Sequence, residues 1–358
     1  MPDTRPILIA AGGTGGHVYP ALAIAEVLKE RGVPIVWLGT KTGTEATAVP
    51  AAGFPIEWIN AVGLRGKSIK ETLLAPARLL HACFQTWQVF SRHRPVGVLG
   101  MGGFVAAPGA LLAVVRRLPL ILHEQNSVAG LTNRVFSRFA NRIFTAFPDV
   151  LSAHSQTACV GNPVRQDIEQ LPEPSVRSRT RGSKPRLLIV GGSLGARVLN
   201  QTVPDAVALL DFECDVLHQC GRTDSVETSN RYSQHQLDAD VRPFITDIAE
   251  AYAWADLVVC RSGAMTVAEL AAAGVPSILV PYPHAVDDHQ TGNARWLSNV
   301  DAAILMPQTE LDAERLAKIL SQTLSDQHRL GAMAQAAKDS HIPCAALQVA
   351  DALLEVAA

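Results

Sequence analysis

Two glycine-rich loops of similar design lie about half a chain apart in this sequence of 358 residues. The first reads GGTGGH at 12–17 and the second reads GGSLGA at 191–196. Each follows a short apolar run, Ile7–Ala11 or Leu187–Val190, and each leads into a helical pattern. Glycines at a strand-to-helix junction let the backbone approach a ligand and direct amide groups at negative charge. The matched pair therefore predicts two nucleotide-binding-like domains, each with its own βαβ series.

Short apolar runs alternate with helical segments in both halves of the chain, which predicts parallel sheets covered by helices on both faces. The intervening segment 166–186 is polar, has no apolar periodicity and contains three prolines, so it is the best linker candidate. We expect a first domain at 1–165, this linker at 166–186, and a second domain at 187–340. A C-terminal helix at 341–358 is expected to pack back on the first domain.

Charge and cysteine content exclude several classes of protein. The formal net charge of −2 gives no support for a nucleic-acid partner, which would normally bind a basic surface. No secretory signal is visible, and no apolar run reaches the length of a membrane span. The six cysteines form no CxxC pair or zinc spacing, so we expect buried free thiols. The neighbouring carboxylates Asp287 and Asp288 point apart, and we predict neither a metal site nor a cofactor.

The first glycine-rich loop is neither a dinucleotide fingerprint nor a P-loop, because the glycine spacing differs and no Gly-Lys-Ser/Thr follows. It does place one imidazole, His17, at the start of a helix. The positive end of a helix favours a neutral imidazole that can accept a proton. His17 is therefore either a general base or a structural histidine that caps the loop.

Polar residues follow other predicted strands of the first half. The segment GMGGFVAAPG at 100–109 is again rich in glycine, and HEQN at 123–126 occupies the same position after the next strand. Ligands of open α/β sheets bind at the carboxyl ends of the strands. These residues suit a polar ligand such as a sugar, or they form a capped loop.

The segment of the second half with the most candidate ligand-binding residues is 259–294. A predicted strand leads through Arg261–Ala264 into a helix that carries Thr266 and Glu269 in its first turns. Amides and a hydroxyl at a helix start suit a diphosphate, and a carboxylate one turn later can accept both hydroxyls of a ribose. A second polar loop, His284–Asn293, follows the next strand.

The stretch 68–95 combines bulky apolar residues with lysines and arginines. A basic amphipathic segment with aromatic residues can lie in the interface of an anionic bilayer, while an ordinary core-facing helix is the alternative. The side chains expected at the membrane are Leu73, Leu74, Leu79, Leu80, Phe84 and Trp87.

Six motifs taken together resemble the peptidoglycan glycosyltransferases of family 28, and the resemblance runs from about Ile7 to the C-terminus. They are GGTGGHVYPALAIAEVL, GGFVAAPGALLA, HEQNSVAGLTNR, GNPVR, GGSLGARVLNQTVP and CRSGAMTVAELAAAGVPSILVPYPHAVDDHQTGNA. The resemblance implies an α/β GT-B fold, in which two Rossmann-like domains with parallel sheets face each other across a cleft.

The activity that this resemblance implies is the inverting transfer of N-acetylglucosamine from UDP-N-acetylglucosamine (UDP-GlcNAc). The acceptor is the C4 hydroxyl of the N-acetylmuramoyl (MurNAc) sugar of lipid I, undecaprenyl-pyrophosphoryl-MurNAc-pentapeptide, and the product is lipid II. Such an enzyme is a metal-independent hexosyltransferase of peptidoglycan synthesis, which serves cell wall biogenesis, cell shape and cell division. It is a peripheral protein on the cytoplasmic side of the anionic cell inner membrane.

Site roles follow from the resemblance residue by residue. His17 is the preferred base and Glu124 the second choice; the backbone of Ile245 contacts uracil, and Glu269 holds the ribose hydroxyls. One departure is His289–Gln290, where some relatives have two glutamines. The residues expected to bind UDP-GlcNAc are Thr14, Gly15, Gly16, Asn126, Arg165, Ser193, Ile245, Ala264, Met265, Thr266, Val267, Ala268, Glu269, Gln290 and Asn293.

Two alternative functions remain at this point. One is a related GT-B enzyme, such as another UDP-sugar:lipid transferase or a UDP-N-acetylglucosamine 2-epimerase. An epimerase acts on the UDP-sugar alone and would not need the apolar, basic stretch 68–95. The other is a non-catalytic nucleotide-sugar-binding protein, which intact His17, Glu269 and Gln290 argue against.

Overall fold

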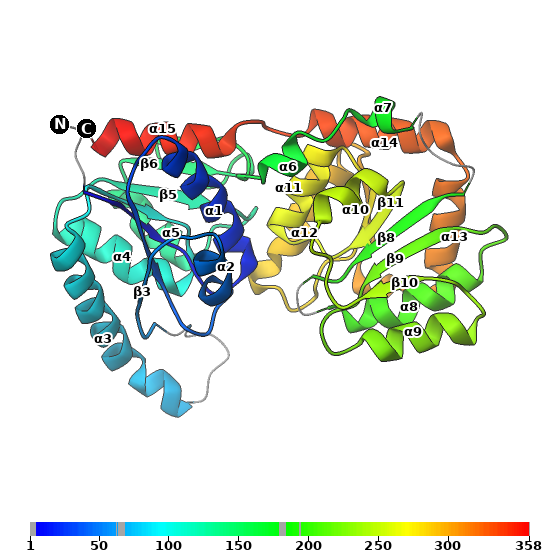
Figure 1. The fold of residues 1–358 in the computed structure, drawn as a ribbon, viewed down its shortest axis with the longest axis horizontal. Helices are drawn as coiled ribbons and strands as arrows, with labels where there is room; N and C mark the ends of the chain where they lie inside the picture. The colour runs from blue at the N-terminus through cyan, green and yellow to red at the C-terminus, as the bar shows by residue number, and fades with distance from the viewer. Residues whose placement is uncertain (1–4, 62, 64–68, 179–183, 193–194, 358) are drawn as a thin grey trace. The chain divides into compact units, whose positions relative to one another are not determined.

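The computed structural model describes residues 5–61, 63, 69–178, 184–192 and 195–357, and the side chains from position 76 onward in the helix that begins at 69. The chain forms two compact units. Unit 1 is Met1–Arg165 with Ile342–Ala358, and unit 2 is Gln166–His341. Each unit has one parallel sheet with helices on both faces, which confirms the predicted fold class (Figure 1).

The sheet of unit 1 has seven parallel strands among the residues that the structure describes. Their order across the sheet is β3 (Ile56–Trp58), β2 (Ile35–Gly39), β1 (Ile7–Ala10), β4 (Gly97–Gly100), β5 (Leu120–Glu124), β6 (Arg142–Thr145) and β7 (Thr157–Cys159). The chain runs outward from β1 in one direction and then from β4 in the other. The strand order therefore reverses between β1 and β4.

Alternate residues of β1 face opposite sides of this sheet, as the period of a strand requires. Ile7 and Ile9 belong to one apolar cluster, and Leu8 and Ala10 belong to the other. The first cluster includes side chains of α1 (Gly15–Glu30), α2 (Glu45–Ala51) and α15 (Ala345–Ala357). The second includes side chains of α3 (Ile69–His93) and α4 (Gly103–Val115), with α5 (Leu131–Phe136) beside α4 and the 3₁₀ turn η1 (Ser137–Phe139) beside α5.

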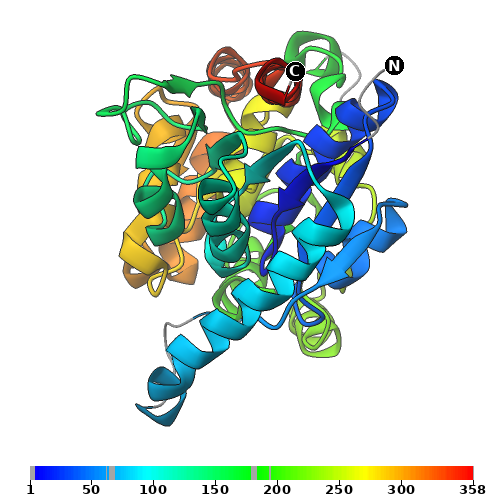
Figure 2. The ribbon, with the colours of Figure 1, turned by 90° about the vertical axis from the view of Figure 1, so that its left-hand side faces the viewer.

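Helix α3 lies along α4, and Figure 2 shows its amino-terminal turns extending beyond the rest of unit 1. Helix α15 packs on α1, where Val349 and Leu353 are fully buried. The last residues of the chain thus complete the core that the first residues begin.

The sheet of unit 2 has six parallel strands in its described part. Their order is β10 (Asp240–Arg242), β9 (Asp215–Gln219), β8 (Arg186–Val190), β11 (Leu257–Cys260), β12 (Ser277–Leu279) and β13 (Ala303–Leu305). The order reverses between β8 and β11. The longer helices of this unit are α8 (Arg197–Ala208), α9 (Ser225–Gln234), α10 (Ile248–Trp254), α11 (Ala264–Ala273), α12 (His289–Ser298), α13 (Ala313–Leu324) and α14 (Gln327–Asp339).

Unit 2 also has its own apolar core. Leu187 and Ile189 of β8 pack with side chains of α8 and α13, among them Leu199 and Leu316. Two short 3₁₀ turns, η2 (Val286–Asp288) and η3 (Gln308–Glu310), follow β12 and β13.

The segment expected as a linker, 166–186, is structured in its first part. It forms α6 (Gln166–Glu169) and α7 (Pro174–Ser178), which contact α11 and α14, and the strand β8 begins at Arg186. Arg177 is buried in unit 2, where its guanidinium donates to the carbonyls of Tyr252 at 3.0 Å and Gly274 at 3.0 Å, and also to that of Ala273. A polar segment without apolar periodicity is therefore anchored by hydrogen bonds.

The cysteines are free, but the expectation that most are buried is wrong. Cys220 and Cys260 are buried, whereas Cys159 and Cys344 are exposed because they lie in a short edge strand and in the turn before α15. None of the described helices is both long and apolar enough to cross a membrane.

Candidate functional site

The predicted ligand loops lie at the topological switch point of each unit. In unit 1 the first glycine-rich loop follows β1, and the segment Met101–Gly103 follows the neighbouring β4. In unit 2 the second glycine-rich loop follows β8, and Arg261–Gly263 follows the neighbouring β11. Ligands of open parallel sheets bind at this position, outside the carboxyl ends of the strands.

The first loop brings His17 into the first turn of α1. The helix begins at Gly15, and the backbone N–H of His17 donates to the carbonyl of Thr14 at 3.1 Å. Thr14 Oγ1 and His17 Nδ1 lie 3.4 Å apart. A Cβ on Gly103 would lie 3.4 Å from Cε1 of His17, so the loops after β1 and β4 meet at this half-buried imidazole. Thr14 is exposed, and Gly16 is half-buried.

Side chains from other elements hold these loops. The indole N–H of Trp37, in β2, donates to the carbonyl of Ala11 at 2.7 Å. The hydroxyl of Thr132, in α5, donates to the carbonyl of Gly103 at 2.8 Å. Both contacts are within unit 1, so the unit itself orders these loops.

Glu124, at the end of β5, is a buried carboxylate with 3% exposure. Its Oε1 accepts from the backbone N–H of Asn126 at 3.1 Å and from the Asn126 amide at 3.5 Å. Its Oε2 accepts from the N–H of Gly130 at 3.0 Å and from the Asn133 amide at 2.9 Å. Both oxygens are therefore used to shape the loop that carries Asn126, which is half-buried.

His123 lies beside Glu124 but points into the core. Burial lowers the pKa of His123 from 6.5 to about 4. Its Nε2 lies 3.0 Å from the carbonyl of Gly161, and its Nδ1 lies 3.0 Å from the amide nitrogen of Gln125. A neutral ring that donates through Nε2 and accepts through Nδ1 satisfies both contacts, so His123 is a structural residue.

In unit 2 the segment 264–269 forms the first turns of α11. Gly263 is the N-cap and supplies no side-chain cap, so the first backbone N–H groups point outward from the helix start. The side chains of Ala264, Met265, Val267 and Ala268 are buried, whereas Thr266 and Glu269 are half-buried. Only backbone groups of the first four, together with these two side chains, can therefore face a ligand.

Glu269 lies one turn after the helix start, as the sequence predicts for a residue that binds a ribose. Its Oε2 accepts from the hydroxyl of Tyr252, in α10, at 3.1 Å. This contact orients the carboxylate from the neighbouring helix.

Gln219, which the sequence analysis does not single out, joins two predicted ligand segments. It is the last residue of β9 and is 4% exposed. Its amide nitrogen donates to the carbonyl of Gly192 at 3.2 Å, and its Oε1 accepts from the N–H of Ile245 at 2.9 Å. One side chain thus fixes the second glycine-rich loop to the predicted uracil segment. Ser193 lies outside the described residues.

The polar loop after β12 is also fastened within unit 2. Gln290 accepts from the N–H of Tyr282 at 2.9 Å through its Oε1, and the Arg261 guanidinium lies 5.5 Å from the Tyr282 ring centre. Asn293 is fully buried, and its amide donates to the carbonyl of Ser262 at 3.2 Å. Asn293 therefore supports the loop before α11 through this hydrogen bond. Gln290, by contrast, is only half-buried.

His289 begins α12. Its Nδ1 lies 2.7 Å from the carbonyl of Val286 and so donates to it. The two residues before it, Asp287 and Asp288, have positive φ angles of 52° and 50°. Arg165, the last residue of the first segment of unit 1, is half-buried.

Four predicted membrane residues are exposed on α3. Leu79, Leu80, Phe84 and Trp87 are between 47% and 71% exposed. Leu73 and Leu74 lie on the same helix, but their side chains are outside the described residues.

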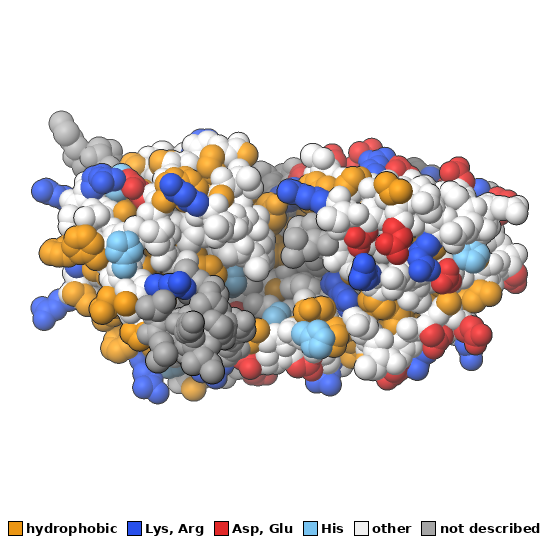
Figure 3. Space-filling model, turned by 90° about the horizontal axis from the view of Figure 1, so that it is seen from below, with side chains coloured by type: hydrophobic (Ala, Val, Ile, Leu, Met, Phe, Trp, Pro, Cys, Tyr) orange, Lys and Arg blue, Asp and Glu red, His pale blue; other side chains and the backbone are white. Residues whose placement is uncertain are grey.

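Helix α4 packs on α3 and has two exposed apolar residues, Leu111 and Val115. The guanidinium of Arg116 lies 5.7 Å from the ring centres of both Trp87 and Phe90. Figure 3 shows hydrophobic and basic side chains together on this side of unit 1. We call the six residues Leu79, Leu80, Phe84, Trp87, Leu111 and Val115 the α3–α4 surface.

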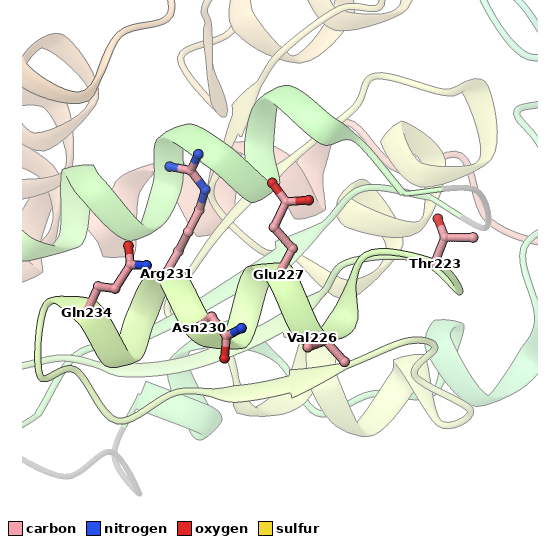
Figure 4. A pocket seen from close by; sticks show the side chains of 6 residues that line it. All are labelled: Thr223, Val226, Glu227, Asn230, Arg231 and Gln234. Carbon is pink, nitrogen blue, oxygen red and sulfur yellow. The ribbon is translucent and has the colours of Figure 1, made fainter.

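Two surface cavities lie elsewhere. One of about 580 Å³ runs along α9 and is lined by polar residues such as Glu227, Asn230 and Arg231 (Figure 4). The other, of about 380 Å³, lies between the turn before β13 and α14. Neither contains a predicted site residue. Within the described part of the chain, no group of three or more His, Cys, Asp or Glu side chains is placed to hold a metal ion.

Comparison with protein families identifies two matching models. The model described as glycosyltransferase family 28 N-terminal domain matches residues 7–145. The model described as glycosyltransferase family 28 C-terminal domain matches residues 186–349.

Two similar curated proteins share the name UDP-N-acetylglucosamine--N-acetylmuramyl-(pentapeptide) pyrophosphoryl-undecaprenol N-acetylglucosamine transferase. The one from Alkalilimnicola ehrlichii is 52% identical over 356 residues, and the one from Methylococcus capsulatus is 50% identical over 354 residues. Both alignments cover 99% of this chain and 99% of the relative.

Solved structures agree with these matches. The crystal structure of Acinetobacter baumannii MurG has a TM-score of 0.83 and 38% identity, covering 98% of this chain and 99% of that one. The calicheamicin glycosyltransferase CalG4 has a TM-score of 0.69 over 99% of this chain and 98% of that one. At 17% identity, that second likeness shows the fold alone.

Proposed function

The chain belongs to glycosyltransferase family 28, and from this premise we propose that it transfers N-acetylglucosamine from UDP-GlcNAc to lipid I, giving lipid II. The observation that carries the proposal is 52% identity over 99% of both chains to a relative whose name states this transfer. The acceptor atom is the C4 oxygen of the MurNAc sugar.

We assign the donor to unit 2. The N–H groups at the start of α11, together with Thr266, suit the diphosphate, because a helix N-terminus carries a positive partial charge. Glu269, oriented by Tyr252, suits the two hydroxyls of the ribose. The second glycine-rich loop and Ile245, joined through Gln219, suit the nucleotide as well.

We assign the base to His17. Its imidazole lies at a helix start where the loops after β1 and β4 meet, and a neutral imidazole can accept a proton near pH 7. Glu124 is the weaker candidate, because both of its oxygens already accept hydrogen bonds from its own loop and from Asn133. We assign Glu124 to holding Asn126 in place, and Thr14, Gly15 and Gly16 to contacts with the sugar nucleotide.

The proposed reaction is a direct displacement. His17 takes the proton of the C4 hydroxyl while the C4 oxygen attacks the anomeric carbon of N-acetylglucosamine. The bond between this carbon and the β-phosphate oxygen breaks, and UDP leaves with the electron pair. Attack from the opposite face inverts the anomeric centre. The α11 N-terminus and Arg165 would stabilise the charge on the departing UDP, and Gln290 would bind the transferred sugar.

We propose that the α3–α4 surface lies against the cytoplasmic face of the inner membrane. Its apolar side chains would enter the interface, and Arg116 would contact anionic headgroups. This placement would present unit 1 to the lipid-linked acceptor.

An assay with radiolabelled UDP-GlcNAc and a soluble lipid I analogue tests the function. We expect release of UDP and a disaccharide product only when the acceptor is present, with the same rate in the presence of EDTA. Conversion of UDP-GlcNAc alone to its manno epimer would support an epimerase instead. Nucleotide binding with no turnover would support a non-catalytic protein.

A further inference from the structure

Glu45 is a fully buried carboxylate for which the proposed mechanism has no role. It is the first residue of α2, shortly after β2 ends. Its Oε1 accepts from the backbone N–H of Thr40 at 2.9 Å and from the hydroxyl of Thr40 at 2.6 Å. Its Oε2 accepts from the backbone N–H of Gly13 at 2.8 Å. The carboxylate therefore links α2 to the first glycine-rich loop.

Gly13 is held from its carbonyl side as well. The backbone N–H of Thr44 donates to the Gly13 carbonyl at 3.1 Å, and the Thr44 hydroxyl lies 3.4 Å from the same oxygen. Gly13 has a φ of +91°, a conformation that favours glycine. The peptide groups before and after Gly13 are thus both fixed by the residues that begin α2.

The space around Glu45 is built for its side chain. A Cβ added to Gly12, Gly39 or Gly43 would collide with Glu45 atoms. Three glycines, one after β1 and two between the end of β2 and the start of α2, therefore leave room for one carboxylate. Substitution at any of them would displace it.

We propose that Glu45 is a positioning residue for the transfer reaction. By holding Gly13 it sets the position of Thr14, the next residue, and of His17, in the first turn of α1. This inference rests on the proposed function and on the role of His17 as base. A buried hydrogen-bonded charge is costly to displace, so the clamp restricts the loop to one conformation. Small displacements of a reacting group reduce rate strongly.

The clamp also makes the two glycine-rich loops electrostatically unlike. The side chain bound to Gly13 carries a carboxylate, whereas the side chain bound to Gly192 is the neutral amide of Gln219. The two loops therefore differ in the kind of side chain that holds them, which fits different roles in the proposed reaction.

Glu45→Gln tests the proposal. The glutamine amide has nearly the same shape as the carboxylate, but its NH₂ group cannot accept a hydrogen bond. In either orientation this group faces a donor, the Gly13 N–H or those of Thr40, and that hydrogen bond is lost. We expect kcat to fall by about 10²-fold, the loss that a 1 Å misplacement of a reacting group can cause. Because UDP is assigned to unit 2, its Kd should stay within about twofold of the wild-type value.

Asp256→Asn is the matched control. Asp256 is also a buried carboxylate and accepts from the backbone N–H of Arg186 at 2.9 Å, but it lies at the amino ends of the strands of unit 2. We expect this variant to lose stability and to keep the kcat of its folded fraction. Hydrogen exchange supplies a readout that needs no turnover: the amide of Gly13 should exchange faster in Glu45→Gln, and peptides from 186–192 should not change.

An unchanged kcat in Glu45→Gln would overturn the proposal. So would parallel losses of kcat and UDP affinity, since these would indicate general destabilisation. If the wild-type protein failed to release UDP with lipid I, the proposed function would be wrong. Unaltered exchange of the Gly13 amide would independently show that Glu45 does not clamp the loop.

Discussion

Replacing Gln219 by leucine should weaken nucleotide binding, because this side chain joins two segments assigned to the donor. Leucine has a similar volume but no polar atoms. The substitution removes the hydrogen bond to the Gly192 carbonyl at 3.2 Å and the one from the Ile245 N–H at 2.9 Å. A buried donor or acceptor left without its partner costs about 1–3 kcal/mol.

The cost will be divided between stability and binding. In the free variant the two segments can relax towards water, and UDP must then order them again when it binds. If 1–3 kcal/mol appears in binding, and about 1.4 kcal/mol corresponds to tenfold, the Kd for UDP rises by roughly 5- to 150-fold. Isothermal titration calorimetry with UDP measures this change directly. The KM for UDP-GlcNAc should rise in the same proportion. The kcat should fall by less than about threefold, because the lost interactions stabilise the bound substrate and the transition state equally.

Gln234→Leu is the control for this experiment. Gln234 is exposed on α9, away from the strand ends, so the same replacement of glutamine by leucine can be made there. It should leave UDP affinity unchanged. A folded Gln219→Leu protein with wild-type affinity for UDP would refute the reasoning, since the two segments would then hold their places without the amide.

Four further predictions concern the base, the ribose, pH and the membrane. His17→Ala should lower kcat by about 10²–10⁴-fold with little change in UDP affinity; full activity would remove His17 from the role of base. Glu269→Ala should raise the Kd for UDP by about 10- to 150-fold, because a hydrogen bond to a charged group contributes about 1.5–3 kcal/mol; calorimetry with 2′-deoxy-UDP should show a smaller difference between variant and wild type. Burial lowers the pKa of His218 from 6.5 to about 3, so the unfolded chain takes up the proton first and stability falls as pH drops below 6.5. By pH 5 the loss from this residue should be about 2 kcal/mol in urea unfolding, and a His218→Gln protein with an equally steep pH dependence would contradict this. Phe84→Ser should weaken binding to anionic vesicles by about tenfold or more without changing turnover of a soluble acceptor; unaltered vesicle binding would place the membrane contact elsewhere.

Local sequence was enough to predict the two parallel sheets and the position of the glycine-rich loops. Glycines after a strand, and polar residues such as Glu124 and Asn126 after another, are signals that span only a few residues. The strand order then places the glycine-rich loops at the switch point of each sheet, and it places Glu124 and Asn126 at the end of β5, the neighbour of β4. No long-range information is needed for this part of the site.

Contacts between distant segments were not predictable in the same way. Glu45 and Gln219 lie 32 and 27 residues from the glycines that they bind, and nothing in their neighbouring sequence distinguishes them from other polar residues. Asn293 shows the same limit: its motif predicts a contact with the ligand, and in the structure its amide donates to the Ser262 carbonyl. A polar side chain beside a loop has the same local signal whether it binds substrate or protein.

The return of α15 to unit 1 has a consequence for biosynthesis. Val349 and Leu353 are fully buried and complete the apolar cluster that includes Ile24 and Leu28 of α1. At translation rates of about 5–20 residues per second, the ribosome needs roughly 10–40 s to make the chain beyond residue 165. Throughout that interval the apolar surface of α1 in the nascent amino-terminal half stays uncovered, because α15 has not yet left the exit tunnel of the ribosome. A mutation that removes α15 would therefore damage the half of the protein that is made first.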